Sequence, residues 1–397
     1  MKVLISGAGP AGLTAAYWLK RYGFNPTIVE RAPSLLVGGY KIDVRGAALQ
    51  VISQMGIHDA VVAARTDMQG AQLVDKEGNV LERMSGDEFG HRVTGDLEIV
   101  RGTLCQILRD HLGEVEILFG DTIQGITQSS DSAQVQFTKN GVREFDCVIG
   151  ADGLRSVIGR RLNLVRPSRW PKRIALVAHY SGVAESREFG EMYVDRGGYC
   201  GVADVGNGLT NVAVVVPVSR AAEIAVDRTE FLESWIAERP QIAERFRGAV
   251  RATPVRATGP FATSARRAWV RGAALVGDAA EFFDPFTGEG IYTALRGGEM
   301  LANLVSNALR SHRDTESALR EYERARRREF SGKWLVEKIV GAAVSSPKLI
   351  NRAARVLSRR RDMADLLVGV VGDFVPAREV LKPGYLLRLL FSPARSA

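Results

Sequence analysis

The chain has 397 residues, of which 46% are hydrophobic and 25% charged, values typical of a globular protein with room for two domains. No apolar run reaches about eighteen residues, which argues against a membrane-spanning helix. Three separated cysteines and five scattered histidines argue against a zinc site or a disulfide framework. The apolar run at the N-terminus is too short for a secretion signal, so we expect a cytoplasmic location.

Hydrophobic periodicity and turn residues predict the elements in chain order. They are strands at residues 2–6 and 27–29 around a helix at 10–21, a helix over 46–65, a hairpin with strands at 73–74 and 80–81 around a turn at 75–79, a helix at 101–112, strands over 115–150, a strand-rich stretch over 173–217, a helix at 227–238, short strands near 253–264, a strand at 273–276 and helices from 288 onward. This order predicts an α/β fold: a Rossmann-type, GR2-like dinucleotide domain with an inserted β-sheet domain and C-terminal helices.

The domain boundaries follow from the same pattern. We assign residues 1–75, 97–168 and 269–345 to the dinucleotide-binding domain, 76–96 and 169–268 to the inserted domain, and 346–397 to a C-terminal helical region. That last region holds ten lysines and arginines against four acidic residues, a local charge of 10 − 4 = +6 out of +8 for the chain. Because the basic excess is local, it does not indicate a nucleic-acid partner.

A glycine turn of the GxGxxG type follows the first strand directly and opens the first helix. Gly7 permits the tight turn, Gly9 lets the backbone approach a pyrophosphate, and Gly12 allows close packing of helix and strand. The helix N-terminus, at Pro10 and Ala11, offers N–H groups and partial positive charge to the phosphates.

An acidic residue ends the second strand, where dinucleotide folds bind the ribose. Glu30, followed by Arg31, lies eighteen residues after Gly12. A carboxylate at this point accepts hydrogen bonds from ribose hydroxyls and repels a 2′-phosphate. The bound dinucleotide is therefore expected to be FAD or NAD rather than NADP.

Two further strand-end carboxylates favour FAD. Residues 147–151 form a buried strand that runs into Asp152-Gly153, and residues 273–276 form another that runs into Gly277-Asp278. The ribityl chain of a flavin carries hydroxyl groups, for which a carboxylate at a strand end is a suitable acceptor. The order and spacing of these motifs predict non-covalently bound FAD.

The segment after Asp278 is expected to meet the flavin ring. Gly288 and Gly290 would let the backbone lie against the isoalloxazine, and the helix that begins there, at Ile291, would point its positive end at the N1–C2 edge. Negative charge builds at that edge on reduction, so the helix dipole would stabilise the reduced flavin.

Taken together, these motifs resemble the class A flavoprotein monooxygenases of the para-hydroxybenzoate hydroxylase type, over roughly residues 1–345. Residues 38–46 and 97–101 resemble loops of tetracycline-inactivating monooxygenases, and the resemblance places Arg101 against the ribityl and phosphate region. Residues 284–291 look more like the geranylgeranyl-reductase branch of the superfamily. There the monooxygenases usually show a histidine where this chain has Glu281, and an asparagine at Tyr292.

The resemblance implies an FAD-dependent oxidoreductase. NAD(P)H would bind transiently and reduce FAD, O2 would add at C4a, and the hydroperoxide would hydroxylate an aromatic or polycyclic small molecule, as in secondary metabolism. By resemblance Pro285 lies near the oxygen-reacting face, and Arg45 is a candidate for the flavin–substrate interface; these are the two candidate catalytic residues. The side chains expected to suit such a substrate are His179, Tyr180, Met192, Tyr193, Tyr199 and Phe261.

Other functions stay open. A flavin-dependent reductase of isoprenoid double bonds would match residues 284–291, and a non-catalytic FAD-binding protein is a second alternative. A halogenase is disfavoured because the WxWxIP signature is absent and residues 170–172 do not supply it. The sequence predicts no oligomeric state.

The C-terminal region contains two apolar stripes with helical spacing. One comprises Leu349, Ile350, Ala353, Val356 and Leu357, and the other Met363, Leu366, Leu367, Val370, Val371 and Phe374. We expect two helices packed on the flavin domain. The alternative is a basic amphipathic surface that makes weak contact with an anionic membrane.

Overall fold

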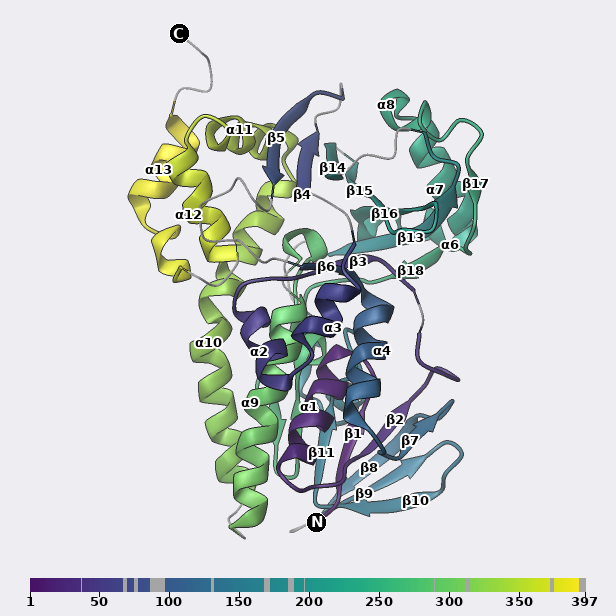
Figure 1. The fold of residues 1–397 in the computed structure, drawn as a ribbon, viewed down its shortest axis with the longest axis vertical. Coiled ribbons are helices and arrows are strands. Elements are labelled where there is room, and N and C mark those ends of the chain that lie inside the picture. The colour runs from purple at the N-terminus through teal and green to yellow at the C-terminus, as the bar shows by residue number, and fades with distance from the viewer. Residues whose placement is uncertain are drawn as a thin grey trace. The chain divides into compact units, whose positions relative to one another are not determined.

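The computed structural model describes residues 1–36, 38–66, 70–74, 78–85, 97–129, 132–167, 172–184, 189–195, 197–288, 290–311, 315–371 and 375–392 (Figure 1). The sequence features outside them are the turn residues 75–77, most of the segment 76–96, Trp170-Pro171, Glu289 and Phe374. The chain divides into two compact units: Met1–Arg65, Ile99–Ser168 and Ala262–Ser331 form the first, and Thr66–Glu98, Arg169–Phe261 and Gly332–Ala397 the second.

The first unit is built on a six-stranded sheet. Its strand order is β20 (Trp269–Val270), β21 (Ala273–Leu275), β11 (Cys147–Gly150), β1 (Val3–Ser6), β2 (Thr27–Glu30) and β7 (Ile117–Phe119). All neighbours are parallel except β20 and β21. The strands β1, β11 and β21 are buried along their whole length, which explains their unbroken apolar sequence. Ser6 pairs with Gly150, and Gly150 with Leu275, so the carboxyl ends of these three strands are level.

Helices pack close to these strand ends. The helix α1 (Pro10–Arg21) contacts both α4 (Arg101–Leu112) and α9 (Gly290–Arg310) (Figure 1). A Cβ at Gly298 would lie 3.1 Å from the Ala11 carbonyl oxygen, so α9 approaches α1 backbone to backbone. The first turns of α1 are thereby fixed against the middle of α9.

The rest of the first unit connects these elements. It comprises β3 (Lys41–Val44), α2 (Ala47–Met55), α3 (His58–Ala63), the antiparallel strands β8 (Ile123–Gln128), β9 (Ala133–Phe137) and β10 (Val142–Phe145), α5 (Val157–Arg161), and the three-stranded sheet of β12 (Val165–Pro167), β19 (Thr263–Ala265) and β22 (Glu281–Phe282). The single helix predicted over 46–65 is wrong. Gly56 ends α2 in the left-handed conformation (φ +79°), and the chain restarts as α3 two residues later.

The second unit contains an eight-stranded sheet. Its order is β17 (Val250–Arg251), β13 (Arg173–Ser181), β16 (Leu209–Pro217), β15 (Gly198–Asp204), β14 (Phe189–Asp195), β4 (Gly70–Val74) and β5 (Val80–Ser85), with β18 (Arg256–Thr258) also on β13. One face is covered by apolar residues of α6 (Ala221–Val226), α7 (Arg228–Ala237) and α8 (Pro240–Ala243). The strand β4, which we assigned to the dinucleotide domain, pairs with β14 and β5 here.

Helices complete the chain. They are α10 (Thr315–Val344), α11 (Pro347–Leu357), α12 (Arg361–Val371) and α13 (Pro383–Phe391). The described residues of both predicted C-terminal stripes lie on helices, but their contacts group them with the second unit, and α13 is a third helix in the same apolar cluster. In the described part of the chain, no helix is both long and apolar enough to cross a membrane.

Candidate functional site

The glycine turn has the shape that a bound diphosphate requires. Gly7 has a φ of +108°, and a Cβ there would lie 2.5 Å from the Ala151 carbonyl oxygen. A Cβ at Gly12 would lie 1.9 Å from the Gly7 carbonyl oxygen, so side chains are excluded at both positions. Gly9 is the N-cap of α1 and Pro10 its first residue, and no side chain caps this helix end. The first-turn N–H groups are therefore available to an anion.

Glu30 holds the turn in place from the end of β2. Its Oε2 accepts a hydrogen bond from the Ala8 N–H at 2.9 Å, and its Oε1 accepts one from the Ala32 N–H at 2.8 Å. A carboxylate offers about four acceptor sites, so both oxygens can still accept a ribose hydroxyl. Glu30 thus holds the glycine turn through two backbone hydrogen bonds, a role that the sequence did not predict. It can still accept a hydrogen bond from a ribose hydroxyl, which is the role that the sequence predicts.

Arg101 reaches the glycine turn from the start of α4. Its Nη2 lies 3.3 Å from the place of a Cβ on Gly9, so the guanidinium packs closely over the backbone of the glycine turn. Burial would lower the pKa of Arg101, but the neighbouring Tyr40, Cys105, Asp278 and Glu30 together raise it. A fixed positive charge therefore lies beside the turn that α1 leaves open.

Asp152 carries an unpartnered oxygen at the carboxyl end of β11. Its Oδ2 accepts a hydrogen bond from the Val157 N–H at 2.6 Å. Its Oδ1 is buried and has no partner among the described residues. Burial raises the pKa of Asp152, against the hydrogen bonds from Ser156 and Val157. A buried orphan acceptor costs stability unless a ligand donates to it.

Asp278 lies where β21 ends and α9 begins. Gly277 has a φ of +61°, and a Cβ there would lie 3.0 Å from the Ala11 Cβ, so this turn touches the start of α1. The Oδ1 of Asp278 is 3.5 Å from the place of a Cβ on Gly290. Burial raises the pKa of Asp278 to about 6, against the lowering effect of Arg101.

The segment before α9 brings together both candidate catalytic residues. Pro285 is exposed and begins a short 3₁₀ turn, whose N-cap Asp284 accepts a hydrogen bond from the Phe286 N–H at 3.1 Å. The turn ends at Gly288 with a φ of +71°, where a Cβ would lie 3.1 Å from Arg45 Nη2. Arg45 is thus next to the segment predicted to face the flavin ring.

Asp43 was missed by the sequence analysis. Its carboxylate forms an ion pair with Arg45. The side chain of Asp43 is 33% exposed and that of Arg45 is 27% exposed. No sequence signal marked the pair, because β3 ends at Val44 and Arg45 lies in the connection that follows it. Asp43 limits the positions that the Arg45 guanidinium can adopt beside Gly288.

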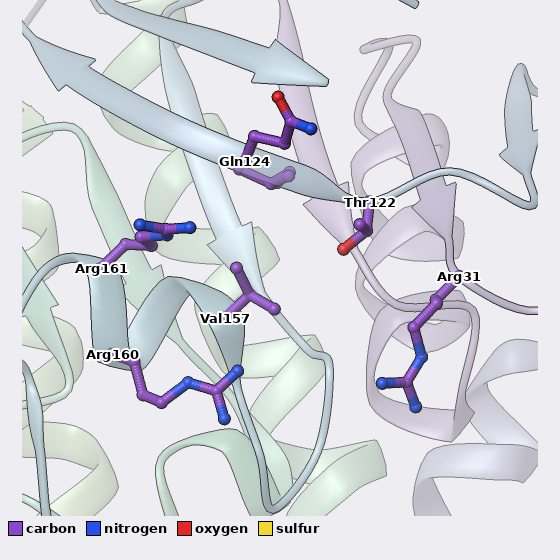
Figure 2. A pocket seen from close by; sticks show the side chains of 7 residues that line it. Arg31, Thr122, Gln124, Val157, Arg160 and Arg161 are labelled. Atoms are coloured by element: carbon purple, nitrogen blue, oxygen red, sulfur yellow. The ribbon is translucent and has the colours of Figure 1, made fainter. Parts of the chain in front are cut away.

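Arg31 lines a cavity of about 490 Å³ (Figure 2). The lining residues are Arg31, Thr122, Ile123, Gln124, Val157, Arg160 and Arg161. Figure 2 shows Arg31 on one side of Val157, and Arg160 and Arg161, both from α5, on the other. Among the described residues, three guanidinium groups and no carboxylate line this space, which suits an anionic group or an aromatic group that stacks on arginine.

The second unit offers a different kind of surface. In the register of its sheet, Leu73, Met192, Gly201, Ala213 and Val177 lie in one row on the face opposite α7. A Cβ at Gly201 would be 3.7 Å from the Met192 methyl carbon, so this methionine rests over the glycine. Small residues in the middle of the row leave a shallow apolar floor.

A buried amide stands beside this floor. Asn211 is two residues from Ala213 on β16, hence on the same face, and only 6% exposed. Its Oδ1 has no partner among the described residues. His179 pairs with Asn211 in register, and its Nδ1 lies 3.2 Å from the Thr253 hydroxyl oxygen. Asn211 was also missed, because no local pattern marks it.

The aromatic residues predicted to meet a substrate divide between the two faces. Tyr180 and Tyr193 pack in the core under the helices, so their prediction as substrate contacts is wrong. The reason is that side chains alternate along a strand: both tyrosines lie on the same face of the sheet as Leu176, whereas Val177 lies on the opposite face. Tyr199 and Phe261 are 2% exposed, while His179 and Met192 are half-buried on the face opposite α7.

The residues of the first unit fit FAD. The glycine turn provides a cradle that any Cβ would fill, Asp152 provides an orphaned acceptor, and Asp278 lies between the starts of α1 and α9. Ile291 is buried in the first turn of α9, whereas Glu289 lies outside the described residues. The elements that carry these groups belong to one unit.

Comparison with known families and proteins agrees with this fit. The family model described as "FAD binding domain" matches residues 1–333. An uncharacterised protein of Mycobacterium tuberculosis is 34% identical over 317 residues, which is 77% of this chain and 85% of that protein. The aurachin C monooxygenase/isomerase of Stigmatella aurantiaca is 30% identical over 321 residues, covering 77% and 81%.

Other matches are shorter or show the fold alone. A flavin-dependent monooxygenase of Legionella longbeachae is 38% identical over 162 residues, and the match spans only 42% of that protein. The crystal structure of tetracycline destructase Tet(51) has a TM-score of 0.71 at 23% identity, covering 92% of this chain and 96% of that one. The p-nitrophenol 4-monooxygenase PnpA of Pseudomonas putida has a TM-score of 0.76 at 18% identity, covering 94% and 96%.

Proposed function

The chain belongs to the FAD binding domain family, that of the flavin-dependent monooxygenases, and on this premise we propose that it hydroxylates an aromatic or polycyclic small molecule with O2 and NAD(P)H. The observation that carries the proposal is the meeting of the glycine turn, Arg101 and Asp278 at the level ends of β1, β11 and β21. When bound, FAD supplies the transfer of electrons from the nicotinamide donor to oxygen.

The residues of the first unit divide the binding of the cofactor among them. The N–H groups at the start of α1 and the guanidinium of Arg101 bind the diphosphate. Glu30 accepts from the ribose, and Asp278 accepts from the ribityl hydroxyls. The cavity beside Arg31 takes the adenosine end, where a planar guanidinium can stack on the base (Figure 2).

A helix dipole and one ion pair meet at the turn where, in this proposal, reduction of the flavin adds negative charge. The N-terminus of α9 contributes its dipole, and Arg45 lies against Gly288 at the same turn. Asp43 pairs with Arg45, and its Oδ2 lies 3.5 Å from the same Cβ place on Gly288, so it offsets the charge of Arg45 there and leaves the helix dipole as the uncompensated positive contribution. Pro285 has no backbone N–H of its own, and the Phe286 N–H is bonded to Asp284, so neither residue is free to donate a backbone hydrogen bond here.

The sheet of the second unit carries the substrate in this proposal. The row from Leu73 to Val177 provides an apolar floor for a flat ring, and Met192 is a flexible side chain that can move aside for it. The Asn211 amide offers a donor and an acceptor to a polar group of that ring.

The alternatives differ in their use of oxygen. The purified protein should be yellow, and NADPH or NADH oxidation should consume O2 in the presence of an accepted compound, tested with tetracycline, para-nitrophenol and aurachin C. Turnover of geranylgeranyl diphosphate without O2 uptake would contradict the hydroxylase and favour the isoprenoid reductase suggested by residues 284–291. A flavin that no nicotinamide donor reduces would favour a non-catalytic FAD-binding protein.

A further inference from the structure

An exposed apolar ridge runs along α13. Leu387, Leu390 and Phe391 are 55%, 39% and 74% exposed, and their spacing puts them on one side of the helix. The other side of α13, with Tyr385, packs into the C-terminal apolar cluster. The ridge is therefore not needed to hold α13 in place.

A basic stripe on α11 adjoins the end of this ridge. Lys348, Arg352 and Arg355 follow one another at i, i+4 and i+7, and α11 contains no acidic residue. Arg352 donates from Nε to the Leu390 carbonyl oxygen at 2.6 Å and from Nη2 to that of Ser392 at 3.1 Å. These two hydrogen bonds fix the stripe beside the C-terminal end of α13.

Three cations around the ridge have no acidic partner in the part of the chain that the structure describes. They are Lys348 and Arg355 on α11 and Arg388 on α13, all exposed. An apolar ridge flanked by unpaired cations matches the interface of an anionic bilayer, where acyl chains lie directly beneath phosphate groups. A symmetric dimer through the ridge would instead bring two basic stripes near each other.

We propose that α11 and α13 form a docking surface for anionic lipid bilayers. Leu387, Leu390 and Phe391 enter the boundary between headgroups and acyl chains, and Lys348 and Arg355 contact lipid phosphates. Each basic residue near an anionic surface contributes about 1 kcal/mol, so a pair sets a difference of about thirtyfold in affinity. The surface lies on the chain's own helices and is independent of the proposed reaction.

The test is co-sedimentation of the full-length, FAD-loaded protein with vesicles. We expect binding to vesicles that contain phosphatidylglycerol, little binding to phosphatidylcholine alone, and weakening by salt. The variant Lys348→Glu/Arg355→Glu should bind at least about thirtyfold more weakly. Leu387→Ser/Phe391→Ser should bind at least about a hundredfold more weakly through loss of apolar area, with thermal stability preserved because both side chains are exposed.

Arg324→Glu/Arg328→Glu is the matched control. Both arginines are exposed on α10, and the change in net charge is the same. This variant should bind like the unchanged protein, which separates the stripe from overall charge. The proposal is overturned if the unchanged protein ignores anionic vesicles or if the control weakens binding as much as the α11 variant. It is also overturned if Leu387→Ser/Phe391→Ser abolishes a dimer in solution and leaves lipid binding unchanged.

Discussion

Asp278 is the residue whose protonation we expect to control FAD binding. Burial raises its pKa to about 6, so protein without FAD carries it largely protonated below that pH. A ribityl hydroxyl donates to the ionised form, and FAD binding therefore favours loss of the proton. We predict that the affinity of the deflavinated protein for FAD rises as the pH increases through about 6 and then levels off, measured by quenching of flavin fluorescence.

The raised pKa of Asp278 has the opposite effect on the stability of the deflavinated protein, which should fall as the pH rises. The folded pKa lies above the ordinary value of 3.8, so ionisation of Asp278 lowers stability as the pH rises from 3.8 to about 6. Asp278→Asn should remove both pH dependences and weaken FAD binding by about tenfold, the effect of one charged hydrogen bond. An unchanged pH profile in this variant would assign the titration to Asp152, whose pKa burial also raises.

A local motif could be predicted, whereas a residue defined by a distant partner could not. The turn that carries Gly7 and Gly12, and the position of Glu30 at the end of β2, could be predicted because a strand, a turn and a helix follow one another in sequence. The orphaned amide of Asn211 became visible only when β16 was placed between β13 and β15. Asn211 stands out because its buried amide oxygen has no hydrogen-bond partner among the described residues, and no sequence pattern encodes such a missing partner.

At the scale of the element, the register of the sheet makes a prediction about Asn211. The amide lies on the same face as the apolar row, and a bound ring would satisfy it. Asn211→Ala should raise KM for the compound accepted in the oxygen-uptake assay by about tenfold, because a buried hydrogen bond is lost. It should also release more of the oxygen as hydrogen peroxide, which a peroxidase-coupled assay measures.

The control separates substrate binding from the rest of the protein. Reduction of the flavin by the nicotinamide donor without substrate should be unchanged in Asn211→Ala, and so should FAD content. Asn211→Asp keeps the acceptor and the size of the side chain but loses the donor, so it distinguishes which pole of the amide is used. Equal KM values for all three proteins would remove Asn211 from the substrate surface.

Element types were predictable to the extent that local sequence decides them. The βαβ unit, α4 and the strands β13–β16 were identified because each carries its own periodicity. The break at Gly56 was missed, since apolar residues continue with helical spacing on both sides of it. The alternation of residues along a strand shows which residues share a face, but not which of the two faces the helices cover. For that reason Tyr180 and Tyr193 were assigned to the substrate surface, whereas they pack under the helices.

At the scale of the whole molecule, the division into two units predicts how FAD changes stability. Glu30, Arg101, Asp152 and Asp278 all belong to the first unit, while the apolar row of the sheet belongs to the second. A ligand stabilises the state that binds it by RT ln(1 + [L]/Kd), which is about 2.7 kcal/mol at about one hundred times Kd. FAD should therefore stabilise the first unit directly.

Amide hydrogen exchange measures this unit by unit. With FAD at about one hundred times its Kd, exchange in β1, β11 and β21 should slow by about one hundredfold, the factor that corresponds to 2.7 kcal/mol. Exchange in β13 and β16 should slow much less, because openings confined to the second unit release no FAD. Equal protection of both sheets would mean that the units open together, as one cooperative body.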